Sequence, residues 1–246
     1  MYSAKINGEP TTFGTSGLLY RSNKLMYDRA TRSLWISFLG EPVIGPLADS
    51  GIVLDYHPVV VTTWEEWASE HPDTTVLSND TGFYSPSFYT SEWDPNSIYY
   101  DYRADPQTMF PVWERDGVLH AKDEVLAVSR GTSHKAYPVS VLNRERVVND
   151  VVGGTPVAIF ASDSTPEARV YARNSGTFRL DAASPSTTGV PSRVYDDQGV
   201  AWLVTEDALV NSADESETLP RLPAHVAFWF GWFAFHPDTE LYRGAE

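Results

Sequence analysis

The sequence predicts an α+β fold that is mostly β, built as two tandem, pseudo-symmetric repeats of antiparallel strands that each end in a short Trp-rich helix. Three observations predict it. Tyr, Phe and Trp make up 13% of the 246 residues, and these side chains favour pleated strands. Clusters of Gly, Pro, Asn and Asp separate short alternating segments, as turns separate strands. A long motif also occurs twice, as internal repeats do.

The repeated motif is W-x-x-W-x-x-x-H-P-D-T, which begins at Trp64 and again at Trp229. Its flanks recur at similar offsets, so we expect two colinear copies with small insertions and deletions. The recurring flanks are Met26-Tyr27-Asp28 with Trp35, against Val194-Tyr195-Asp196 with Trp202, and Met1–Lys5, against Val170–Arg173.

In the first copy, alternation over 31–38 predicts a strand. A helix is predicted from Trp64 because Trp64, Trp67 and His71 fall on one helical face. Thr62 or Thr63 can cap this helix, with Glu65 or Glu66 completing a capping box. Pro72 disfavours helical backbone at His71, so the helix should end there.

In the second copy, short apolar segments predict strands at 125–128, 156–161 and 168–172. The spacing of apolar residues over 139–150 predicts a helix that ends before Gly153 and Gly154. The second Trp-rich helix, from Trp229, is apolar on both faces. It should therefore be buried or form an oligomer contact.

The organisation that follows is one globular unit with three parts. Residues 1–78 form the first copy, residues 79–123 a spacer rich in aromatic and acidic residues, and residues 124–246 the second copy. The first copy is shortened at its N-terminus relative to the second, which has about 40 additional residues before its Val-Tyr strand.

Composition excludes several classes of function. The formal charge of −15 disfavours nucleic acid and anionic membrane surfaces as partners. The longest apolar run, 226–235, is about half of a membrane span, and no secretion signal follows Met1, which leaves the compartment open. Cysteine is absent, so disulfides and thiolate chemistry are excluded. No dinucleotide-type glycine loop is present, and no nucleotide, flavin or haem is expected.

Several motifs resemble one family. They are Phe13–Asn23, Met26–Arg29, Ser33–Trp35, His71–Thr74, Lys135–Pro138, and Asn149-Asp150 with Gly153-Gly154. Together they resemble DUF3179, a bacterial and archaeal domain of unknown function, over nearly the whole chain. The resemblance implies no particular activity. Family members usually carry a Cys-Pro-Leu-Cys segment ahead of the Phe-Gly-Thr-Ser-Gly stretch, and this chain lacks both cysteines, so any family function that needs thiols would be lost here.

Candidate catalytic residues are sought where the two copies differ. The polar segment 13–23 occurs in the first copy alone, and its glycines around Ser16 could expose backbone N–H groups to an oxyanion. Ser16, Asp28 and His71 are the candidate catalytic groups. The competing interpretations are a glycine-rich turn for the segment and a helix-capping role for His71.

The spacer supplies the candidate binding groups. Aromatic and amide side chains that could hold a ligand are Tyr20, Asn23, Trp93, Tyr99, Tyr100 and Tyr102. Oxygen ligands at Asp94, Asn96 and Asp101 could hold Ca²⁺. The alternative is a solvated acidic loop whose aromatic residues pack on the core.

Three functions remain open. The first is a hydrolase, assisted by Ca²⁺, that acts on a small neutral ester, lactone or glycoside. The second is a protein that binds a small molecule or carbohydrate without catalysis. The third is an assembly protein, with a homo-oligomer as one form, in which 226–235 or the uncovered face of the first copy is the interface.

Overall fold

The computed structural model describes residues 1–59, 61–91, 94–174, 176–181 and 189–245. These residues are mostly β, as predicted, and contain four α-helices and one 3-10 helix. None of the described helices has both the length and the apolar character that crossing a membrane requires.

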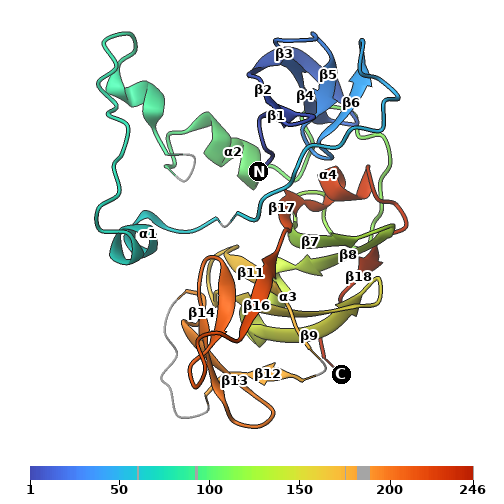
Figure 1. Ribbon diagram of the computed structural model, residues 1–246. Helices are drawn as coiled ribbons and strands as arrows, with labels where there is room; N and C mark the ends of the chain where they lie inside the picture. The colour runs from blue at the N-terminus through green and yellow to red at the C-terminus, as the bar shows by residue number, and fades with distance from the viewer. Residues whose placement is uncertain (60, 92–93, 175, 182–188, 246) are drawn as a thin grey trace.

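The N-terminal part is a small antiparallel meander in which each strand pairs with the next (Figure 1). Its strands are β3 (Phe13–Tyr20), β4 (Asn23–Asp28), β5 (Leu34–Ile36) and β6 (Glu41–Ile44), preceded by a hairpin of β1 (Lys5–Ile6) and β2 (Glu9–Pro10). The predicted strand over 31–38 is thus shorter than expected. Arg32 takes a φ of 64°, which turns the chain before β5 begins.

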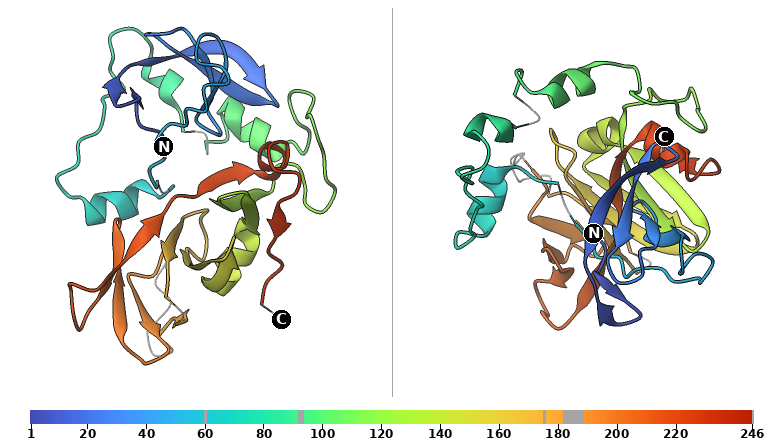
Figure 2. Two further views of the ribbon diagram at one scale, coloured as in Figure 1. Left: turned by 45° about the vertical axis from the view of Figure 1, so that its right-hand side comes forward. Right: turned by 90° about the horizontal axis from the view of Figure 1, so that it is seen from above.

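The described residues of 58–123, which are 58–59, 61–91 and 94–123, then pass around the outside of the molecule and are here called the strap (Figures 1 and 2). The strap carries α1 (Trp64–Glu70), the 3-10 helix η1 (Pro86–Tyr89) and α2 (Ile98–Ala104). Helix α1 confirms the predicted signals. Thr63 is its N-cap, a capping box joins Thr63 and Glu66, and His71 ends the helix.

The C-terminal part contains two sheets. The smaller has the order β17-β7-β8-β18, and the larger has the order β12-β13-β14-β15-β16-β11-β10-β9. In the smaller sheet the strands are β7 (Glu124–Arg130), β8 (Ser133–Pro138), β17 (His225–Phe228) and β18 (Glu240–Leu241). In the larger they are β9 (Val147–Val152), β10 (Thr155–Ala161), β11 (Ala168–Ala172), β12 (Phe178–Arg179), β13 (Arg193–Asp196), β14 (Ala201–Val204), β15 (Ala208–Asn211) and β16 (Thr218–Leu222).

The larger sheet curls until its two outer strands nearly meet. The side-chain amide of Asn149, on β9, donates to the carbonyl of Phe178 on β12 and accepts from its N–H, both at 2.8 Å. A sheet that closes on itself hides the strand edges that would otherwise be free to pair with other chains. The interior is filled by a buried cluster that includes Phe160, Tyr171 and Trp202.

The predicted helix over 139–150 is right at its start and wrong at its end. Helix α3 spans Val139–Glu145. Arg146 then takes a φ of 61°, and the following residues form β9, which pairs along β10. Apolar spacing alone cannot distinguish a helix from a strand here, because the β10 partner that decides the outcome lies further along the chain.

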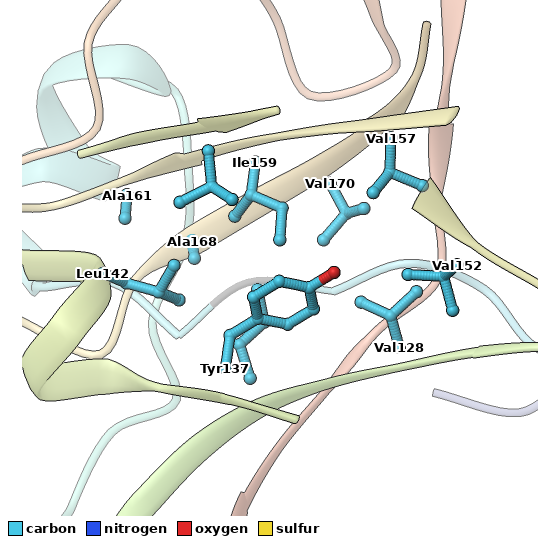
Figure 3. Packing of buried hydrophobic residues seen from close by; sticks show 11 residues of the cluster. Val128, Tyr137, Leu142, Val152, Val157, Ile159, Ala161, Ala168 and Val170 are labelled. Carbon is cyan, nitrogen blue, oxygen red and sulfur yellow. The ribbon is translucent and has the colours of Figure 1, made fainter. Parts of the chain in front are cut away.

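One face of the smaller sheet packs on the larger sheet. Figure 3 shows Tyr137 and Val128 pointing toward Val157, Ile159 and Val170. The other face packs on the N-terminal meander and on α4 (Trp229–Phe233), through a cluster that includes Ile36, Ala136 and Trp232. The second Trp-rich helix is therefore buried, one of the two predicted outcomes, with Trp229 and Trp232 at 3% and 0% exposure.

The repeated residues make the same contacts in both halves. Asp28 accepts from the Trp35 indole N–H at 2.9 Å, and Asp196 accepts from that of Trp202 at 3.0 Å. Trp35 makes an edge-to-face contact with Phe13, and Trp202 makes one with Phe178. The ring centroids are 5.8 Å apart in both pairs.

The helix motifs also agree in local geometry. The indole N–H of Trp67 donates to Thr74 at 3.2 Å, and that of Trp232 donates to Thr239 at 2.9 Å. Each of these tryptophans packs against the histidine four residues later, with ring centroids 4.0 Å and 4.2 Å apart. The Trp–Thr and Trp–His contacts therefore recur with the motif, although α1 has a side-chain cap and α4, which is shorter, has none.

Candidate active site

A cleft of about 570 Å³ lies where the N-terminal meander meets the smaller sheet of the C-terminal part. The N-terminal part contributes aromatic rings, including Tyr2, Phe38 and Tyr56. The C-terminal part contributes most of the polar groups and Trp232; the polar groups include Ser129, Arg130, His134, His225, His236 and Asp238. The cleft thus combines an apolar wall with a concentration of imidazoles, a composition typical of small-molecule sites.

Strand alternation brings Ser129 and His134 to the cleft. Side chains on β7 alternate between faces, and Ala127 packs toward Trp232, so Ser129 points the same way. The hairpin turn contains Gly131, whose φ is +57°, and its register sets Ser129 opposite His134. The Ser129 hydroxyl and His134 Nδ1 are 2.8 Å apart.

His236 comes from the repeated motif, at the end of α4. Its ring lies against His134, with centroids 3.8 Å apart, and against Trp232. The backbone N–H of His236 donates to the carbonyl of Trp232 at 3.0 Å, in the turn that follows the C-cap residue Ala234. His236 therefore lies beyond the end of α4, where its ring reaches the cleft.

His225 enters the cleft from β17, where it pairs with Ala127 of β7 and so shares its face. Its ring stacks between Phe38, at a centroid distance of 5.1 Å, and Tyr56, at 4.6 Å. Both of these rings belong to the N-terminal part, so the His225 imidazole contacts the N-terminal part from the C-terminal part.

Burial keeps the histidines of the cleft in their neutral form at neutral pH. Burial lowers the pKa of His225 to about 4, because the charged imidazolium loses its hydration. Burial, helped by the neighbouring His134, also lowers the pKa of His236 to about 4. The pKa of His134 is lowered by burial too, although the Asp238 carboxylate works in the opposite direction. At neutral pH all three rings are therefore neutral, and His134 can accept a proton from Ser129.

These buried imidazoles predict a stability change in mild acid. A histidine whose folded pKa lies below its unfolded value of 6.5 takes up protons more readily in the unfolded state, so stability falls as pH drops from about 6.5 to about 4. His225→Phe keeps an aromatic ring that can stack between Phe38 and Tyr56, and it removes one group that takes up a proton on unfolding. We expect its unfolding free energy, from urea titrations at stepped pH, to decline less over this window than that of the wild type.

His120→Phe is the matched control, since His120 is exposed. A decline as shallow in this control as in His225→Phe would contradict the assignment to the cleft.

The three predicted catalytic residues have separate neighbours. The Ser16 hydroxyl donates to the carbonyl of Leu25 at 2.7 Å. Asp28 is fully buried and accepts from Thr31, Ser33 and Trp35. His71 packs on Trp67 at the end of α1. The structure brings no two of Ser16, Asp28 and His71 into contact, and none of them lines the cleft.

The predicted ligand-binding residues also divide between two places. Tyr20 packs near Phe235, with centroids 6.1 Å apart, and Asn23 accepts from the Ser37 hydroxyl at 2.9 Å. Tyr99, Tyr100 and Tyr102 lie on α2 in the strap, where the first two are exposed. Trp93 lies outside the described residues.

Two of the three predicted calcium ligands, Asp94 and Asn96, form a local turn. Asp94 accepts from both the backbone N–H and the side-chain amide of Asn96, at 2.8 and 2.9 Å. Asp101 lies on α2. In the ranges that the structure describes, no three His, Asp or Glu side chains are grouped closely enough to hold a metal ion.

Ser129, His134 and His225 were not predicted from the sequence. One signal was available, because the apolar segment 125–128 and the segment 133–138 flank Gly131, and a hairpin over them pairs Ser129 with His134. His225 had no such signal, since only the folding of the meander onto β17 gives it two aromatic neighbours.

The comparisons with known proteins give a family and no activity. Neither curated proteins nor solved structures match this chain. The family described as "Protein of unknown function (DUF3179)" matches residues 1–239 of the 246. Since this match covers nearly the whole sequence, as the motifs predicted, the chain belongs to the DUF3179 family.

Proposed function

We propose that this protein is a hydrolase that acts on a small neutral ester or lactone in the cleft between its two halves. The observation that carries the proposal is the Ser129–His134 pair, 2.8 Å apart, which faces a cleft of about 570 Å³. A hydroxyl bonded to a neutral imidazole is the standard arrangement of an activated nucleophile.

The chemistry follows from these groups. Ser129 Oγ attacks the carbonyl carbon of the substrate while its proton passes to His134 Nδ1. The tetrahedral intermediate expels the alcohol, which takes that proton from His134. Water, deprotonated by the same imidazole, then cleaves the acyl-serine and releases the acid. Asp238 lines the cleft, and its carboxylate opposes the lowering of the His134 pKa by burial, so it favours the imidazolium that forms during each step.

The shape and charge of the cleft support a neutral substrate with an apolar portion. The rings of Tyr2, Phe38 and Tyr56 form its apolar wall. Arg130 lines it as well as Glu41 and Asp238, so the local charges have both signs. The formal charge of the whole chain, −15, disfavours the approach of an anionic substrate.

A panel of p-nitrophenyl esters, lactones and aryl glycosides tests the proposal. Turnover of short-chain esters or lactones that disappears with the Ser129 hydroxyl is the expected result. Turnover of glycosides alone would contradict it, because glycoside hydrolysis requires a pair of carboxylates.

Calcium assistance is a separate part of the proposal. Asp94, Asn96 and Asp101 offer the oxygen ligands that Ca²⁺ prefers. The Ser129 mechanism does not require the ion. Calorimetric titration of Ca²⁺ into the wild type and into the Asp94→Ala/Asp101→Ala double variant, with ester turnover before and after EDTA, decides it. Equal heats for the wild type and the double variant, with equal turnover before and after EDTA, would show that calcium has no role at these residues.

Ligand binding without turnover is the second candidate. The stack of Phe38, His225 and Tyr56 favours it, because such a wall holds a flat or aliphatic group whether or not a reaction follows. Saturable binding of the same esters by an enzyme that does not turn them over would support this alternative.

The proposal also includes a duplication, in which residues 1–78 and 124–246 derive from one module. The matching Trp–Asp, Trp–Thr and Trp–His contacts support it. So does a fourth match, since the hydroxyls of Tyr2 and Tyr171 each donate to a main-chain carbonyl of the following meander, Phe38 and Thr205.

A further inference from the structure

Helix α1 presents its aromatic face to solvent. Trp64 is 58% exposed, and no residue of the helix is buried. Val59 and Val61, in the segment leading into α1, are 43% and 50% exposed. A monomeric protein rarely leaves neighbouring large apolar side chains open in this way unless they meet a partner.

The opposite face of α1 is anchored to the larger sheet. Glu70 pairs with Arg169 at 3.4 Å, and Arg169 also pairs with Glu167. Thr62 donates to both Glu66 and Glu167, at 2.9 and 3.1 Å. Arg169 and Glu167 are almost fully buried, so the anchor holds the helix with its tryptophan face outward.

The second half of the molecule shows what covers this face when it is occupied. Helix α4 has the same Trp–His and Trp–Thr contacts as α1. There, however, the tryptophans are buried against the β7–β8 hairpin, in one cluster with Val125, Ala127 and Ala136. The strand that leads into α4 is β17, which pairs with β7.

The histidine of the motif has different neighbours in the two halves. His236 has the ring of His134, from the same hairpin, packed on it. His71 packs on Trp67 of its own helix, and among the described residues the hairpin that would supply a ring like His134 is not beside it.

We infer that Val61, Trp64, Trp67 and His71 form a docking site for a β-hairpin supplied by a partner polypeptide. The hairpin resembles β7–β8: it places small apolar side chains against Trp64 and Trp67, and a polar ring against His71. This inference rests on the proposed duplication and is independent of the hydrolase activity.

The test uses the full chain and a cyclised hairpin peptide with the sequence Glu124–Pro138, whose fold is verified by NMR. We expect saturable binding of the labelled peptide by fluorescence anisotropy, weakened about tenfold or more by Trp64→Ala, as for aromatic residues at the centre of an interface. A peptide with Ala127→Lys and Ala136→Lys should not bind. Trp113→Ala is the matched control, since Trp113 is 68% exposed and lies outside α1, and it should bind like the wild type.

Three results would overturn the inference. One is the absence of binding at about 1 mM peptide, the weakest affinity a specific contact would show. Another is binding that Trp64→Ala leaves unchanged. The third is a Trp64-dependent dimer in analytical ultracentrifugation, which would make a second copy of this chain the occupant. Trp64→Ala should hydrolyse esters at the wild-type rate. Because turnover does not depend on this site, the docking inference and the hydrolase proposal can fail separately.

Discussion

Ser129→Ala is expected to lower kcat/KM for ester or lactone hydrolysis by about a thousandfold or more, since it removes the proposed nucleophile. The side chain makes one hydrogen bond, to His134, so the melting temperature should change little. Initial rates across a substrate series, with circular dichroism to verify the fold, measure the effect.

The matched control is Ser133→Ala in the same hairpin. Ser133 pairs with Arg130 and, by strand alternation, faces away from the cleft. It should retain wild-type rates. Equal rates for Ser129→Ala and the wild type would exclude Ser129 as the nucleophile.

The pH profile supplies a second readout of the same pair. Only neutral His134 can accept the serine proton, so activity should fall as pH drops through the pKa of this residue. Because burial lowers that pKa, the plateau should extend below the ordinary histidine value of 6.5. A profile that requires a protonated histidine would contradict the assigned role.

Asp28→Ala is expected to lower the free energy of unfolding by about 3–5 kcal/mol, because it leaves buried donors without an acceptor. Asp28 is 0% exposed and accepts from Thr31, from the backbone N–H of Ser33 and from the indole N–H of Trp35. Trp35 is itself 1% exposed, so water cannot replace the lost acceptor. Urea unfolding followed by tryptophan fluorescence measures the loss.

Asp196→Ala is the internal control, at the corresponding position of the second half. Asp196 accepts from Trp202 in the same way but is partly exposed. Water can therefore satisfy the freed donors, and the cost should be about 1–2 kcal/mol. Equal losses for the two variants would show that burial does not set the cost.

Acid should mimic Asp28→Ala. Burial alone would raise the pKa of Asp28, but hydrogen bonds from Thr31, Trp35 and Ser33 outweigh it and lower the pKa below 3.8. The stability from this carboxylate is therefore complete above pH 3.8 and is lost as pH falls toward the folded pKa. This window lies below that of the cleft histidines, so the two contributions can be separated.

The same variant tests the catalytic role predicted for Asp28 from the sequence. Under the Ser129 mechanism, ester turnover by Asp28→Ala should fall only with the folded fraction. A larger loss would restore Asp28, and with it Ser16 and His71, as the groups to pursue.

Local signals gave the correct result wherever the deciding residues are close in sequence. The Thr63–Glu66 capping box and Pro72 define α1 from within one short segment. The repeated motif likewise produces the same Trp–His contact in both halves, since its partners are four residues apart. The helix predicted over 139–150 failed at its end, where β10 competes for Val147–Val152.

The amino-acid sequence by itself determined the family, the mostly β composition, the two Trp-rich helices and the capping of the first, because these depend on neighbours along the chain. Only the tertiary structure decided which residues share a cleft, which helix is buried and which is open. Ser129 and His134 meet through strand register, but His225 lies between Phe38 and Tyr56 because two distant segments pack together. Such packing is set by the shape and burial of surfaces that form after the local elements, and a pattern within one segment carries no record of it.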